Sequence, residues 1–134
     1  MLGNKEFVFT LLYRATQQEY TAEEFHRKCD HRSPTVSLLK LNNGNCIGGF
    51  TSSRWQTPSS QFLGQYYMDH SALLFNLTDE ISYPVKNADK AIYCFRNTGP
   101  CFGDEELFVE KKSNEEGQCK SFANQIGYNI QTKN

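Results

Sequence analysis

The sequence lacks a strong charge of either sign. Its 134 residues include 14 lysines and arginines against 15 aspartates and glutamates, which gives a formal net charge of −1. Proteins that bind nucleic acid usually carry a basic patch. The nearest candidate, Arg27-Lys28 with Arg32, is interspersed with acidic residues and is interpreted as a solvated face. We therefore expect no nucleic-acid partner.

Long hydrophobic runs are also missing. A helix that spans a bilayer needs about 20 consecutive apolar residues, and no stretch of this chain approaches that length. The apolar stretch at residues 7–12 is short and is closely followed by Arg14, which does not fit a secretory signal peptide. The sequence predicts a cytoplasmic protein with no segment inserted in a membrane.

The cysteines do not form a recognisable framework. There are five of them, they are widely spaced, and no two make a Cys-x-x-Cys pair: Cys29, Cys46, Cys94, Cys101 and Cys119. A disulfide framework in a secreted domain usually has an even number of cysteines. We expect these thiols to be reduced and mostly buried.

No catalytic centre or metal site is recognisable either. His26, Cys29 and His31 lie close together, but zinc needs four ligands, and the others would have to come from distant residues. Cys101 lies in a predicted Gly-Pro-Cys-Phe-Gly turn, where the acidic residues that follow do not favour a reactive thiolate. There is no Gly-x-Ser-x-Gly motif. We predict no catalytic residue, no metal and no cofactor.

The length fits a single domain over residues 1–134. Thr21-Ala22-Glu23-Glu24 has the form of a capping box, in which the Thr21 hydroxyl accepts from the backbone of Glu24 and the Glu24 carboxylate reaches back. Ala22, Phe25 and Cys29 follow at helical spacing and predict one buried stripe. Ser33-Pro34 ends this segment.

Most of the remaining chain is predicted to form strands, at residues 7–14, 35–41, 46–51, 72–77, 83–85, 91–95 and 106–110. Asn43-Gly44 predicts a tight type I′ hairpin between the second and third of these. Gly48 and Gly49 indicate a bulge or a close approach of another backbone. Residues 111–120 are polar and predict a surface turn. Together these features predict a mainly β domain with short helices, built as a sandwich of two sheets.

Residues 52–71 stand apart as a long polar segment that contains aromatic residues. Loops of this length are uncommon unless they are functional or disordered. Tryptophan, tyrosine and arginine are enriched at interface hot spots, so we predict a protein-binding role for Arg54, Trp55, Phe62, Tyr66 and Tyr67. The alternative is that these rings fold back onto the sandwich, and this alternative is favoured for Trp55.

Several short blocks together resemble the TLDc domain of the oxidation-resistance proteins. They are Leu12-Tyr13-Arg14-Ala15, Phe25-His26-Arg27-Lys28-Cys29-Asp30, Gly48-Gly49-Phe50-Thr51-Ser52, Ser71-Ala72-Leu73-Leu74-Phe75-Asn76-Leu77 and Gly99-Pro100-Cys101-Phe102-Gly103. The resemblance implies a β-sandwich linked to protection against oxidative damage, and members that bind the vacuolar-type proton ATPase. It brings no agreed catalytic residues. Relative to the family, the chain is predicted to lack an N-terminal helical segment and the last strand.

Three functional hypotheses follow. The favoured one is a non-enzymatic protein-interaction domain that binds or regulates a larger assembly, such as the proton ATPase on an organelle. The second is a structural subunit built permanently into a large complex. The third is a cysteine-based antioxidant or redox-responsive protein, motivated by the five cysteines and the stress link of the family.

Overall fold

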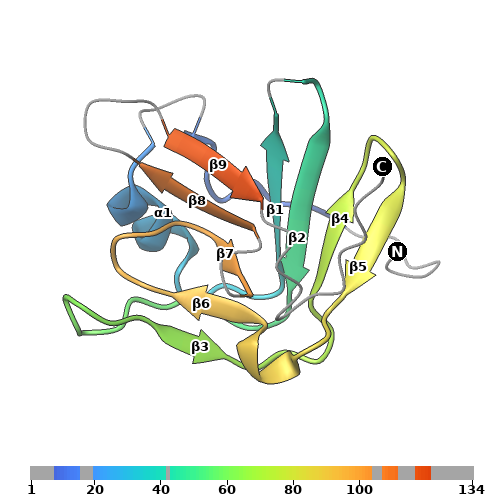
Figure 1. Cartoon of the computed structure of the whole chain (residues 1–134). Helices are drawn as coiled ribbons and strands as arrows, with labels where there is room; N and C mark the ends of the chain where they lie inside the picture. Colours follow the sequence, from blue (N-terminus) through green and yellow to red (C-terminus); the bar gives the residue numbers. More distant parts are fainter. Residues whose placement is uncertain (1–7, 16–19, 42, 104–106, 112–116, 122–134) are drawn as a thin grey trace.

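The computed structural model describes residues 8–15, 20–41, 43–103, 107–111 and 117–121 (Figure 1). These residues form two antiparallel sheets and one short α-helix, which confirms the predicted mainly β class. The first sheet has the strand order β1-β2-β4-β5: β1 (Thr35–Lys40), β2 (Cys46–Thr51), β4 (Leu73–Asn76) and β5 (Ile81–Pro84). The second has the order β3-β6-β7-β8-β9: β3 (Gln65–Tyr67), β6 (Ile92–Cys94), β7 (Cys101–Phe102), β8 (Leu107–Lys111) and β9 (Gly117–Ser121).

The helix begins where the capping box places it. In α1 (Ala22–Cys29), the backbone N–H of Glu24 donates to the Thr21 hydroxyl at 3.0 Å. The Glu24 carboxylate does not reach back as predicted, because it accepts two hydrogen bonds from Arg27 instead, at 3.0 and 2.8 Å. Phe25 and Cys29 are buried, so the predicted stripe faces the core.

The hairpin between β1 and β2 is confirmed, although its loop is longer than expected. The strand register ends at Lys40 and Cys46, and beyond it the Leu41 N–H donates to the Asn45 carbonyl at 2.8 Å, so the connection is longer than a two-residue turn. Gly44 has a φ of 89°, a left-handed conformation that glycine adopts at no steric cost. The Asn43 side chain accepts from the backbone of Asn45 at 3.0 Å and closes the turn.

Two adjacent glycines let aromatic rings approach both faces of β2. A Cβ atom on Gly48 would lie 2.7 Å from Cζ of Phe75 in β4, and a Cβ on Gly49 would lie 2.5 Å from Cζ of Phe102 in β7. Such distances are too short for a real side chain. The predicted approach of another backbone is found at Gly48, where an added Cβ would collide with the Ser37 carbonyl oxygen, whereas at Gly49 the approaching group is the Phe102 ring, which brings the two sheets together.

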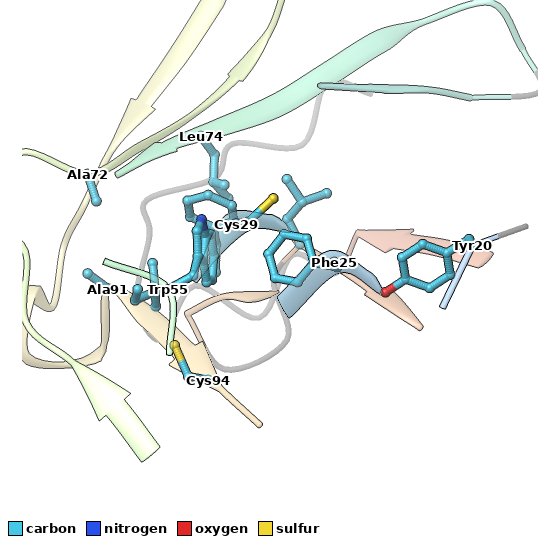
Figure 2. Close-up of a cluster of buried hydrophobic side chains, with 11 residues drawn as sticks. Tyr20, Phe25, Cys29, Trp55, Ala72, Leu74, Ala91 and Cys94 are labelled. Atoms are coloured by element: carbon cyan, nitrogen blue, oxygen red, sulfur yellow. The ribbon is translucent and has the colours of Figure 1, made fainter. Parts of the chain in front are cut away.

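The core lies between the sheets and is centred on aromatic rings (Figure 2). Trp55 is 1% exposed and packs edge-to-face against Phe25 of α1 and Phe102 of β7, with ring centroids 5.5 Å apart in both pairs. Aromatic pairs prefer this arrangement because the positive edge of one ring meets the negative face of the other. Leu74 of β4 joins this cluster, while its neighbour Phe75 is also buried, as expected for a central strand.

Several sequence predictions were wrong. Residues 8–14 contain no strand, because the adjacent residues Leu12 and Tyr13 both pack against the core and break the alternation that a strand needs. Phe7 lies outside the described residues. Cys101 lies in β7 rather than in a turn, part of the long 52–71 segment forms β3, and β9 occupies a stretch predicted as a surface turn. These strands are short, and each depends on a partner strand rather than on its own composition.

Candidate functional site

The segment of residues 52–71 is fixed at its base by Asp69. One carboxylate oxygen accepts from the Thr51 hydroxyl at 2.7 Å and from the Ser52 backbone N–H at 2.6 Å. The other accepts from the Ser52 hydroxyl at 2.7 Å and from the N–H and hydroxyl of Ser71 at 2.9 and 2.8 Å. Asp69 therefore joins the two ends of the segment and holds them to the end of β2.

The charge of Asp69 is stabilised by these donors. Desolvation on burial would raise the pKa of this carboxyl, but the hydrogen bonds from Ser52, Thr51 and Ser71 outweigh burial and lower the pKa to about 2. Asp69 is 6% exposed, so the carboxylate is a buried anion with five donors. The residue therefore has a structural role, which the sequence-based interpretation missed.

Trp55 supplies the second fixed point. Its indole N–H donates to the Thr35 hydroxyl at 2.9 Å, and its ring is part of the core. The Trp55 ring is folded onto the sandwich, as in the alternative favoured for this residue. Arg54, directly before it, is exposed.

Between these fixed points, the chain carries an exposed pair of apolar side chains. Phe62 is 86% exposed and Leu63 is 70% exposed; we call this pair the apolar tip. The Ser60 hydroxyl accepts from the backbone N–H groups of both, at 3.2 and 3.0 Å. Immediately after the tip, the N–H of Gly64 donates to the Tyr93 hydroxyl at 2.9 Å. The turn before β3 projects from the body of the molecule (Figure 1).

The two predicted tyrosines lie on β3 and point to opposite faces of it. Tyr66 is half-buried beside Tyr93 of β6, with ring centroids 4.9 Å apart, and Lys90 places its Nζ atom 5.1 Å from the Tyr66 ring centroid. The Tyr67 hydroxyl donates to the Gln56 side chain at 3.3 Å. The five predicted residues therefore do not form one surface.

A polar chain that sequence reasoning did not foresee connects the helix to this segment. The Thr57 hydroxyl donates to Oδ2 of Asp30 at 2.5 Å, and Oδ1 of Asp30 pairs with Nδ1 of His26 at 2.7 Å. On its other side, Nε2 of His26 lies 2.9 Å from the carbonyl oxygens of Phe95 and Thr98. Each ring nitrogen of His26 therefore faces oxygen atoms that can accept a hydrogen bond.

The comparison with known families agrees with this architecture. A family model described as the TLDc domain matches residues 4–133 of the chain. The chain belongs to the TLDc family. No match was found among the curated proteins. Among the described residues of this TLDc domain, no helix is long and apolar enough to cross a membrane.

Of the four cysteines of this TLDc domain whose side chains the structure describes, Cys29, Cys94 and Cys101 are buried and Cys46 is partly exposed. Burial raises the pKa of the Cys29 thiol to about 11 and that of the Cys94 thiol to about 12. The thiolate is the nucleophilic form, so this environment suppresses reactivity at both positions. Cys101 is 1% exposed. The side chain of Cys119 lies outside the described residues.

The histidines considered as metal ligands do not converge in this TLDc domain. His26 is 6% exposed and engaged with Asp30 and two carbonyls, while His31 is exposed. Within the part of the chain that the structure describes, no group of three or more His, Cys, Asp or Glu side chains is positioned to hold a metal ion. The spacing of His26 and Asp30, four residues apart on a predicted helix, was the one sequence signal for the polar chain.

Proposed function

We propose that this TLDc domain is a non-enzymatic protein-interaction domain that binds or regulates a larger assembly. The apolar tip is the observation that carries the proposal. Exposed apolar side chains are common singly, but Phe62 and Leu63 are adjacent, are 86% and 70% exposed, and lie on a turn ordered by Ser60. An ordered turn loses little conformational entropy when it binds, so more of the free energy of burying the Phe62 ring and the Leu63 side chain remains as affinity.

Two other predicted residues of the segment are accessible. Tyr66 is half-buried next to the tip-bearing turn, and Arg54 is exposed at the start of the segment. Trp55 acts from the core, because its ring is 1% exposed and supports the segment from beneath. We therefore assign direct contact with a partner to Phe62, Tyr66 and Arg54, with Tyr67 in a supporting position.

The leading partner is the vacuolar-type proton ATPase, and the leading location is the cytoplasmic side of the organelle that carries it. This choice rests on what resemblance to the TLDc family implies, including the link to oxidative-stress resistance. The raised pKa values of Cys29 and Cys94 do not support the cysteine-based alternative. The permanent-subunit alternative predicts poor behaviour in isolation, so a stable monomer of the purified chain counts against it.

The test uses the purified chain and detergent-solubilised proton ATPase. We expect the wild type to retain the ATPase subunits, and Phe62→Ser to lose them. Leu38→Ser is the matched control, since Leu38 is 61% exposed but lies on β1 of the other sheet. If the wild type retains no ATPase subunit, that partner is wrong. If Phe62→Ser and the wild type bind equally, the tip is not the contact.

A further inference from the structure

Thr57 combines an accessible hydroxyl with a proline at the next position. It is exposed, lies outside any helix or strand, and precedes Pro58. Serine or threonine followed by proline is the minimal acceptor sequence of proline-directed protein kinases, which bind their substrates in extended form. The Thr57 hydroxyl also donates a hydrogen bond to Asp30, so a chemical change at this oxygen would remove one hydrogen bond of the polar chain.

Thr57 also lies at a cavity of about 520 Å³ whose wall contains two arginines. Arg27, Arg96 and Asn97 line it together with Thr57, and the carboxylates of Glu23 and Asp30 lie in the same wall. Arg27 already pairs with Glu24. No residue in the described part of the chain pairs with the guanidinium of Arg96.

The polar chain explains why Thr57 and Arg96 share this cavity. The position of the His26 ring is fixed, because it contacts Asp30 on one side and the carbonyls of Phe95 and Thr98 on the other. Arg96 lies between those two carbonyls in the sequence. The same imidazole thus holds the Thr57 partner and the turn that carries Arg96.

We propose that Thr57 is a phosphorylation site and that Arg96 receives the phosphate. A proline-directed kinase supplies ATP as the phosphoryl donor. The Thr57 oxygen bonds to the γ-phosphorus, the bond from that phosphorus to the β-phosphate oxygen breaks, ADP leaves, and the hydroxyl proton passes to the kinase base. The product is a phosphate ester with two negative charges near neutral pH.

The modification would change the contacts of the segment in a defined direction. An ester oxygen has no proton, so it can no longer donate to Asp30. The phosphate and the Asp30 carboxylate repel each other, whereas the Arg96 guanidinium attracts the phosphate and can bind it through two N–H groups. The segment would therefore exchange its tie to Asp30 for a tie to Arg96, five residues before the apolar tip begins.

The first experiment asks whether the site is used. The intact chain is incubated with ATP and a purified proline-directed kinase, and phosphate is located by mass spectrometry. Ser33, which is exposed and precedes Pro34, is the internal comparison, and a peptide of residues 52–64 shows that the kinase accepts the sequence. We expect phosphate on Thr57 of the wild type and none there in Thr57→Ala. Labelling of the peptide but not of Thr57 in the intact chain would overturn the proposal.

The second experiment asks where the phosphate goes. Its second ionisation, which occurs near pH 6 in free phosphothreonine, is followed by phosphorus NMR in the phosphorylated chain. Pairing with Arg96 lowers this pKa relative to the phosphorylated 52–64 peptide, and Arg96→Gln returns it toward the peptide value. A phosphate that remains beside Asp30 titrates at a higher pH than the peptide. Either a higher value or one unaffected by Arg96→Gln refutes the assignment of Arg96. Neither experiment depends on the proposed ATPase partner.

Discussion

Replacing Asp69 by asparagine removes a charge but almost no volume, so it tests the anchor at the base of the 52–71 segment. Whichever way the new amide turns, its NH₂ group faces donors where an oxygen had accepted. One orientation leaves the Ser52 backbone N–H without an acceptor, and the other leaves the Ser71 N–H without one. A buried unsatisfied donor costs about 1–3 kcal/mol, and the charge-assisted bonds are lost as well. We expect Asp69→Asn to lower the free energy of unfolding by about 3 kcal/mol.

The pH dependence of the free energy of unfolding tests the same substitution in a second way. Because the folded pKa of Asp69 is about 2 against an ordinary 3.8, its stabilisation is fully present above pH 3.8 and is lost as the pH falls through 2. The shift corresponds to about 2 kcal/mol. Asparagine does not titrate, so the difference in the free energy of unfolding between the wild type and Asp69→Asn should become smaller as the pH falls from 3.8 toward 2.

Urea denaturation followed by tryptophan fluorescence measures both effects, since Trp55 is the single tryptophan and is buried. In a separate thermal unfolding experiment at pH 7, the midpoint of Asp69→Asn should be lower than that of the wild type by roughly 10 °C. Asp89→Asn is the control, because the Asp89 carboxylate is exposed and makes no hydrogen bond within the described residues. A loss below about 0.5 kcal/mol in Asp69→Asn, no larger than for an ordinary surface change, would refute the anchoring role.

Three further outcomes are expected. Gly49→Ala should destabilise the chain by about 1–3 kcal/mol, since the methyl group meets the Phe102 ring, and a midpoint equal to the wild type would show that the sheets can separate without cost. His26→Ala should cost about 3 kcal/mol, because Asp30 and two carbonyls lose their donor, and hydrogen exchange should increase in α1 and the following segment. The Cys94 thiol, with its pKa raised to about 12, should resist alkylation at pH 8 until urea unfolds the chain, and mass spectrometry of the labelled peptides would detect premature modification.

Local signals predicted local structure well. Three elements were predicted from nearby residues alone: the start of α1 from the Thr21 cap, the hairpin from its glycine, and β4 from its apolar run. Each of them is found at the predicted place. The strands β3, β7 and β9 were missed, because two to five residues become a strand only through hydrogen bonds to a neighbour. Residues 8–14 have strand composition but form no strand, because the adjacent residues Leu12 and Tyr13 both pack against the core.

In the candidate site, too, some features could be predicted from residue type, and others depend on contacts that form only in the folded chain. Residue type alone identified Phe62 and Tyr66 as exposed or half-buried aromatics of the long segment. The alternative favoured for Trp55, a ring folded onto the sandwich, agrees with its 1% exposure, but residue type could not show that Asp69 joins the two ends of the segment. The contact of His26 with Phe95 and Thr98 spans 69 and 72 positions of sequence, and only the folded chain brings these residues together.

The two fixed ends of the 52–71 segment have a consequence for engineering and for divergence. With Trp55 and Asp69 bearing the attachment, the residues at the apex contribute little to holding the sandwich together. A foreign recognition peptide grafted between positions 59 and 63 should thus be displayed without unfolding its host. Under the proposed function, natural variation at this apex would change what the domain recognises while its framework stays the same.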